Sequence, residues 1–298
     1  MRIGLAIIGA GRVGRALGRR LRERGAKIGC VVARSEASAR RAVRFIGAGT
    51  PCAGMTRQLL LSRVILIATP DDAIADVAEE LARIGGEELR GKIVLHTSGA
   101  LDSRALHAVQ ERGAAVGSMH PLQSFSGVTV PSLDGKVFSI EGDAAAVRVA
   151  RQIARSLGGS PVPIARDKKI LYHAAAAMAA GHVLAVEEAA TQLLVSVGMR
   201  RSEAVRALLP LTRQVLENFE RLGPHAAWTG PLSRRDFRVV KAHVEALREL
   251  PEEFAQANKW LNRLAARVLA QDADGMLAEL QDIIAEKKLK ARVTGGNA

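Results

Sequence analysis

The N-terminal stretch from Ile3 to Gly14 is IGLAIIGAGRVG, and it decides the fold of the first part of the chain. Its apolar run from Ile3 to Ile8 predicts a buried strand, which glycines at positions 9, 11 and 14 follow directly. A helical pattern then continues to Arg24, and a second apolar run extends from Lys27 to Ala33. Strand, glycine loop, helix and strand in this order are typical of the βαβ unit that binds dinucleotides.

Each glycine of this loop has its own role in dinucleotide binding. Gly9 permits the tight turn, Gly11 lets the backbone approach the pyrophosphate, and Gly14 lets the helix pack closely on the strand. The N-terminus of the helix offers free N–H donors and the positive end of its dipole to the phosphates. Arg12 and Val13 lie inside the loop, so we expect them to contact the same cofactor.

The end of the second predicted strand indicates which dinucleotide would bind. Proteins that bind NAD place an acid here for the ribose 2′-hydroxyl, but the segment Gly29 to Ser35 is GCVVARS and contains none. Arg34 offers a charged donor fork to a 2′-phosphate, and Ser35 can add a hydrogen bond, with Arg40 and Arg41 close behind. The sequence therefore predicts NADP rather than NAD. The alternative is that Arg34 is only a solvated loop residue.

Outward from this unit, the chain divides into two regions with different patterns. In the first region, apolar runs typical of buried parallel strands alternate with helical patterns. These apolar runs are Val64–Ala68, Ile93–His96, Ala115–Met119, Val137–Glu141 and Val162–Ile164. From Asp167 onward nearly every segment has a helical period. The prediction is an α/β fold, with a doubly wound Rossmann domain over residues 1–165 and an all-α domain over residues 166–298.

Two later strand ends are expected to complete a cofactor site, because ligands of open α/β sheets lie at the carboxyl ends of the strands. Thr69 begins the turn after one strand, and Ser98 lies in the turn after the next. Either hydroxyl could contact the ribose or carboxamide on the nicotinamide side. Either could also cap the helix that follows, and the two roles are compatible.

Candidate proton donors lie near the predicted domain junction. His120 follows a strand in a loop rich in hydroxyl and amide groups, whereas Lys169 and His173 stand at positions i and i+4 of the first helix after the junction. Hydride transfer to a C=O or C=N bond needs such a donor. The alternatives are a solvated surface lysine and a histidine satisfied inside a core.

The composition is that of an ordinary globular protein with an unusual charge. Of 298 residues, 48% are hydrophobic and 24% charged, which allows a sizeable core. The formal net charge is +13, yet the bases are spread along the chain in pairs such as Arg19-Arg20 and Arg200-Arg201. Without a basic block, and with 3% aromatic residues, the sequence does not predict nucleic-acid binding.

Three further features bear on the compartment. The longest apolar stretch, Leu171 to Val197, contains several polar residues, which are too many for a membrane span, so we expect a buried helix and no membrane. Cys30 and Cys52 cannot supply a disulfide framework or a zinc set, so we expect a reduced chain without a metal. The first residues lack the layout of a signal peptide, which favours a cytoplasmic protein.

Several short segments carry a family resemblance: the glycine loop, Ala68-Thr-Pro-Asp-Asp72, His96-Thr-Ser-Gly99, His120-Pro-Leu-Gln-Ser-Phe125, Tyr172-His-Ala-Ala-Ala176 and Thr229-Gly-Pro231. Together they resemble the bacterial Rossmann-like proteins with a DUF2520 C-terminal domain, which are relatives of ketopantoate reductase, pyrroline-5-carboxylate reductase and the β-hydroxyacid dehydrogenases. The resemblance covers nearly all of the chain. It implies NADP as cofactor, a homodimer formed through the helical domain, and a catalytic cleft between the two domains.

The residues and the resemblance together predict an NADPH-dependent reductase of a small polar carbonyl or imine, with a ketopantoate-like 2-keto acid as the first candidate substrate. Lys169 or His173 would deliver the proton while His120 and Ser98 orient this small molecule. The alternative is a protein that senses NADP without turnover and signals through its helical domain.

Overall fold

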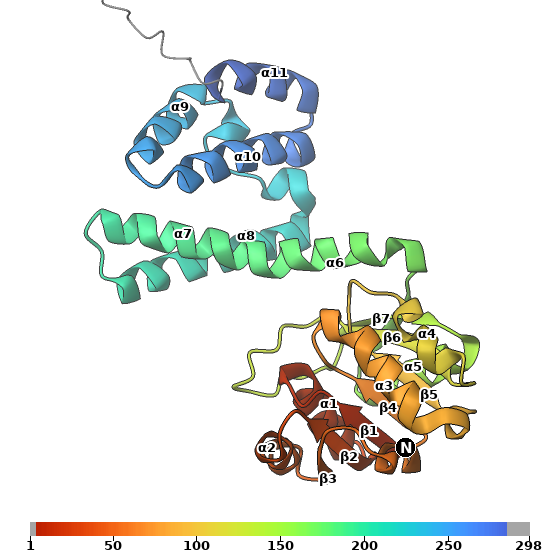
Figure 1. Cartoon of the computed structure of the whole chain (residues 1–298). Coiled ribbons are helices and arrows are strands. Elements are labelled where there is room, and N and C mark those ends of the chain that lie inside the picture. Colours follow the sequence, from red (N-terminus) through yellow and green to blue (C-terminus); the bar gives the residue numbers. More distant parts are fainter. Residues whose placement is uncertain (1–3, 285–298) are drawn as a thin grey trace, which may run out of the picture. The chain divides into compact units, whose positions relative to one another are not determined.

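The computed structural model describes residues 4–284, which form two compact units that divide after His182 (Figure 1). The first unit contains a β-sheet with its covering helices, and the second contains only helices. The boundary expected at residues 165 and 166 lies at the entry to helix α6 (Lys169–Ala177), which belongs to the first compact unit.

One eight-stranded sheet organises the first unit, in the order β3-β2-β1-β4-β5-β6-β7-β8. All neighbouring strands are parallel except β6 and β7, which are antiparallel. The chain crosses between β3 and β4 from one side of β1 to the other, as in a doubly wound Rossmann sheet, so the predicted fold class is confirmed. The strands are β1 (Gly4–Ile8), β2 (Lys27–Ala33), β3 (Thr50–Ala53), β4 (Val64–Ile67), β5 (Ile93–His96), β6 (Ala115–Pro121), β7 (Val137–Gly142) and β8 (Ser160–Pro163).

Successive side chains of each strand point to opposite faces of this sheet, and helices cover both faces, so both are buried. In β1, Leu5 and Ile7 belong to a core shared with helices α1, α2 and α5. Ala6 and Ile8 belong to a second core shared with α3 and the turn before α4. The covering helices are α1 (Arg12–Glu23), α2 (Glu36–Ile46), α3 (Ile74–Gly85), α4 (His107–Gln110) and α5 (Ala144–Ser156).

The second unit is all-helical, as the sequence predicts. Helices α9 to α11 share a small core that contains Leu232, Val240, Ala266 and Met276. Helix α8 runs through Pro210 and has non-helical backbone angles only at Gly223, where φ is 77°. The helices are α7 (Val183–Ser196), α8 (Arg201–Ala227), α9 (Phe237–Ala246), α10 (Glu252–Leu269) and α11 (Ala273–Ile284).

The apolar stretch from Leu171 to Val197 is helical, but the prediction that it is buried is wrong. The helical run Arg166–Ser196 has 31 residues and a mean hydropathy of 1.3 over its most apolar window, so by length and composition it could cross a membrane. None of that window is buried within the chain. Leu171 and Leu184, for example, are 68% and 69% exposed. Periodicity alone could not distinguish a helix that the chain covers itself from one left uncovered.

The expectation of a reduced chain is also wrong for this structure. Cys30 on β2 and Cys52 on β3 form a disulfide, with their Cα atoms 6.3 Å apart. They are 22 residues apart in sequence and meet because β2 and β3 are neighbours in the sheet. The disulfide was not predicted because the sequence does not show that β2 and β3 are neighbours. Two cysteines are too few for a framework of several bridges, but they are enough for one.

Candidate functional site

The glycine loop between β1 and α1 has two closed positions and one open position. A Cβ atom on Gly9 would lie 2.6 Å from the backbone of Ala68, and φ of Gly9 is +96°. A Cβ atom on Gly14 would lie 2.1 Å from the carbonyl oxygen of Gly9, whereas on Gly11 it would meet nothing within 4 Å. Gly9 and Gly14 are therefore needed for the turn and for helix packing, and Gly11 faces space that a phosphate could occupy.

The first turn of α1 is also open to an anion. Gly11 precedes the helix and has no side chain to cap its amide groups. Arg12 is exposed, and its side chain lies beside Gly127 in the loop after β6. Val13 instead packs against the core on the α1 face of the sheet. This end of the helix offers N–H groups, a positive dipole and a guanidinium to a bound phosphate.

The end of β2 carries a free arginine. Arg34 is exposed and makes no hydrogen bond or ion pair with any other residue between 4 and 284. The other candidates there are engaged: Arg40 pairs with Glu36 at 2.5 Å, Arg41 donates to Ser38 at 2.8 Å, and Ser35 caps α2 by accepting from the Ser38 amide. Arg34 is therefore the residue of this group that is available to a ligand.

Thr69 and Ser98 differ in what their hydroxyl groups do. The Ser98 hydroxyl donates to Asp71 at 2.8 Å and accepts from the amides of Ala100 and Leu101 at 3.1 and 2.9 Å, so it serves the turn as a cap. The Thr69 Oγ1 atom is buried and has no hydrogen-bond partner in the chain. A buried polar atom without a partner is costly, so Thr69 is the better candidate for a ligand contact.

A second cluster lies at the carboxyl ends of β5 and β6, where α6 packs against them. His120 Nδ1 and the Tyr172 hydroxyl are 2.9 Å apart in a hydrogen bond, and the rings of His120 and His173 have centroids 6.0 Å apart. A Cβ atom on Gly99 would lie 2.6 Å from His173 and 3.0 Å from His120, so both rings rest on this glycine. The structure thus brings the two candidates His120 and His173 together, and Tyr172 joins them.

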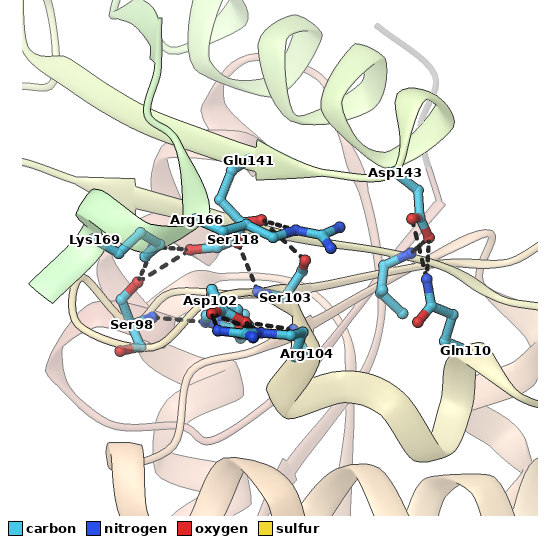
Figure 2. A network of polar contacts seen from close by, with 12 residues as sticks. Ser98, Asp102, Ser103, Arg104, Gln110, Ser118, Glu141, Asp143, Arg166 and Lys169 are labelled. Carbon is cyan, nitrogen blue, oxygen red and sulfur yellow. Dashed lines mark hydrogen bonds and ion pairs between the residues drawn. The ribbon is translucent and has the colours of Figure 1, made fainter.

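Lys169 lies four residues before His173, on the same face of α6, and is only 1% exposed. Its ammonium donates to the carbonyl oxygen of Ser98 at 3.0 Å and to the hydroxyl of Ser118, which itself donates to the Ser98 carbonyl at 3.1 Å (Figure 2). The alternative of a solvated surface lysine is therefore wrong. Lys169 joins α6 to the ends of β5 and β6.

The ionisable groups of this cluster have shifted pKa values. Burial, aided by the positive charge of Lys169, lowers the pKa of His96 and of His120 to about 4. Burial also lowers the pKa of Lys169 to about 8, against the opposing effect of nearby carboxylates. Burial raises the pKa of the Tyr172 phenol. At neutral pH the cluster therefore combines a largely protonated Lys169 ammonium with the neutral imidazoles of His96 and His120 and the neutral phenol of Tyr172.

A buried polar network behind the cluster was not predicted from the sequence. His96 donates through Nε2 to the Asp102 carbonyl at 3.1 Å and accepts the Ser98 amide at Nδ1. Glu141 on β7 accepts from the amide and hydroxyl of Ser103 at 2.6 and 2.9 Å, and from Arg166 at 3.2 Å (Figure 2). Apart from the His96 motif, no local pattern marks these residues, because their partners are 25 to 38 positions away.

Comparison with known proteins gives two family models. Residues 1–121 match a Rossmann-like domain, and residues 136–266 match DUF2520, a domain of unknown function. No curated protein sequence matches the chain.

Solved structures resemble nearly the whole chain. A Bacteroides fragilis protein assigned to the NADP oxidoreductases is 22% identical, with a TM-score of 0.72 over 88% of this chain and 97% of that one. A reductive aminase from Aspergillus terreus, in complex with NADPH and ethyl-5-oxohexanoate, is 19% identical, with a TM-score of 0.68 over 96% and 100%. Pyrroline carboxylate reductase from Plasmodium falciparum, with NADP bound, is 12% identical, with a TM-score of 0.57 over 95% and 98%. At these identities the similarity is one of fold, and the two family models show that the chain consists of a Rossmann-like domain followed by a DUF2520 domain.

Proposed function

We propose that this protein is an NADPH-dependent reductase of a small polar compound with a C=O or C=N bond. The observation that carries the proposal is that an open glycine loop and a polar cluster with a buried ammonium lie along the carboxyl edge of one sheet. Dinucleotide enzymes of this fold bind the cofactor across that edge. The fold neighbours include proteins solved with NADP or NADPH.

The residues present fit NADPH, which supplies the hydride when bound. Gly11 and the start of α1, with Arg12 and the backbone of Val13, would hold the pyrophosphate, and Arg34 would hold the 2′-phosphate. Ser35 would join Arg34 only by giving up its cap on α2. The partnerless Thr69 hydroxyl and the Ser98 turn would lie toward the nicotinamide. The Thr69 hydroxyl without a hydrogen-bond partner and the free guanidinium of Arg34 are the two features that favour this fit most directly.

The polar cluster would handle the proton and the orientation of the substrate. His173 and His120 present imidazole groups on Gly99, whereas Lys169 provides a positive charge from behind the loop. A fixed cation in a buried site stabilises negative charge that develops on a substrate oxygen. We therefore assign proton delivery to His173 or Lys169, and orientation to His120.

The test is consumption of NADPH with a panel of 2-keto acids, ketopantoate included, and of cyclic imines. The imines belong in the panel because reductive aminase and pyrroline carboxylate reductase share this fold. We expect turnover with at least one class, and a loss of 10²-fold or more in Lys169→Met and His173→Ala. A folded protein that binds NADPH and turns over no member of the panel would support the alternative, a sensor of NADP.

Cofactor choice has a separate test. Arg34→Ala is expected to weaken NADPH binding about tenfold or more and to leave NADH binding unchanged, since the guanidinium would contact only the 2′-phosphate. Arg41→Ala is the matched control, because Arg41 already donates to Ser38. Equal binding of NADPH and NADH by the unmodified protein would rule out the role given to Arg34.

The partner that we propose besides the substrate is a second copy of the chain. Helices α7 and α8 carry large apolar side chains that stay exposed among the described residues of one chain, such as Leu184 at 69% and Phe219 at 56%. Covering such a face with an identical one removes it from water. A homodimer of this kind would be soluble, as expected for a cytoplasmic protein.

A further inference from the structure

We infer that Glu141 is the positioning residue of this site, because its carboxylate joins the loop after β5 to the entry of α6 and so holds Lys169 against Ser98 and Ser118. The inference rests on the proposed function for its catalytic meaning. Nothing in the motifs or in the comparisons assigns a role to Glu141.

The contacts of Glu141 link two segments that are far apart in the sequence, one after β5 and one before α6. One carboxylate oxygen accepts the Ser103 amide, and the other accepts the Ser103 hydroxyl and the Arg166 guanidinium (Figure 2). Ser103 directly follows the loop from Thr97 to Asp102, which contains Ser98 and Gly99, and begins a short 3₁₀ helix. Arg166 lies three residues before Lys169, in the turn that leads into α6. The single buried carboxylate of Glu141 therefore fixes both the loop that contains Ser98 and Gly99 and the turn that leads into α6.

The sheet places Glu141 next to the lysine site. Glu141 on β7 is directly opposite Ser118 on β6 in the antiparallel pair, so their side chains lie on the same face. The hydroxyl of Ser118 accepts from the Lys169 ammonium. Glu141, at 7% exposure, and Lys169, at 1%, are thus opposite charges in a region with little water, where their attraction is strong.

Several charged or titratable groups face Lys169 from the elements packed around it. Three carboxylates raise its pKa against the effect of burial: Glu141 on β7, with the largest effect, then Asp102 after β5 and Asp71 after β4. His96 on β5 and His120 on β6 are neutral at physiological pH because their pKa values are about 4. Arg166 is held by Glu141. Removal of the Glu141 charge would therefore take away the largest of the three effects that keep Lys169 protonated, and would leave Arg166 without this partner.

The experiment follows the ionisation of Lys169 directly and does not require turnover. The full-length protein is labelled with ¹³C-lysine, the Lys169 signal is assigned with Lys169→Met, and the signal is titrated in the unmodified protein and in Glu141→Gln. Glutamine keeps an oxygen that can accept from Ser103 but carries no charge. We expect Lys169 in Glu141→Gln to bind its proton roughly tenfold more weakly, so that it titrates at lower pH. Asp143→Asn is the matched control, because Asp143 directly follows β7, is held by Gln110 and the Val116 amide, and is not among the carboxylates that shift the pKa of Lys169.

The second readout is the pH profile of NADPH-dependent reduction with whichever substrate the panel identifies. The descending limb of kcat is expected to move to lower pH in Glu141→Gln and to stay in place in Asp143→Asn, with KM for NADPH unchanged in both. An unchanged Lys169 titration in a folded Glu141→Gln protein would overturn the inference. If no substrate is found, the proposed reductase fails, but the lysine titration still decides the role of Glu141.

Discussion

His96 and His120 make the stability of the first unit depend on pH. Both have a folded pKa of about 4, below the value of about 6.5 for an unfolded chain. The unfolded state therefore binds more protons between these values, so stability is complete above pH 6.5 and is lost as the pH falls toward 4. Over that window, each of the two histidines is expected to lower the free energy of unfolding by on the order of 3 kcal/mol.

Urea unfolding at pH 7 and pH 4.5 checks this dependence. His120→Gln should lose less stability between the two pH values than the unmodified protein, because the titrating group is absent. His107→Gln is the control, since the His107 side chain is 70% exposed and lies outside the cluster. A His120→Gln protein with the same pH dependence as the unmodified protein would contradict the assignment.

At the level of residues, sequence patterns found the groups that belong to local motifs and missed those that act through distant partners. His120, Lys169 and His173 lie on strand ends and a helix face that the period reveals, and the structure brings them to Gly99 and Ser98. The burial of Lys169 and the role of Glu141 depend on the pairing of β6 with β7. Pairing of strands far apart in sequence is not encoded in any short window, so these features needed the fold.

At the scale of elements, the glycine loop separates the requirements of folding from those of binding. Gly14→Ala would place a Cβ atom 2.1 Å from the Gly9 carbonyl and is expected to destabilise the first unit by about 2 kcal/mol. Gly11→Ala would place its Cβ atom in open space and is expected to change stability by less than about 1 kcal/mol. The same methyl group would occupy the space proposed for the pyrophosphate, so NADPH binding should weaken roughly tenfold or more.

Thermal unfolding and NADPH titration of the two variants make the comparison. Gly11→Ala should keep the melting temperature and lose binding, whereas Gly14→Ala should lose melting temperature. Normal NADPH affinity in Gly11→Ala would show that the open position is not part of the cofactor site.

Most strands could be predicted because they are continuous apolar runs with both faces buried. The strand β3 was missed, since Thr50–Ala53 has only four residues and contains Pro51. Such a strand is possible at the edge of the sheet, where proline need not donate to a neighbour. The antiparallel direction of β7 was not predicted either, because an apolar run does not reveal strand direction.

For the whole molecule, the decisive feature is the apolar surface of α7 and α8, which residues 4–284 leave open to solvent. Leu216 and Phe219 lie three positions apart on α8, and each is 56% exposed. Glu187 on α7 accepts a hydrogen bond from Thr212 on α8 at 2.8 Å, so a polar contact already joins the two helices. Polar side chains of this kind are costly in lipid, which favours contact with another protein surface over insertion in a bilayer.

The homodimer can be tested with exposed apolar residues chosen in pairs. Phe219→Asp is expected to raise the dimer dissociation constant at least tenfold, because it places a charge in the proposed interface. Val128→Asp is the control, since Val128 is 85% exposed but lies in a loop of the first unit. Sedimentation velocity should then show dimers for the unmodified protein and for Val128→Asp, and monomers for Phe219→Asp at micromolar concentration. Monomers in all three samples would exclude the homodimer, and flotation of the unmodified protein with lipid vesicles would show that the apolar helices meet a membrane instead.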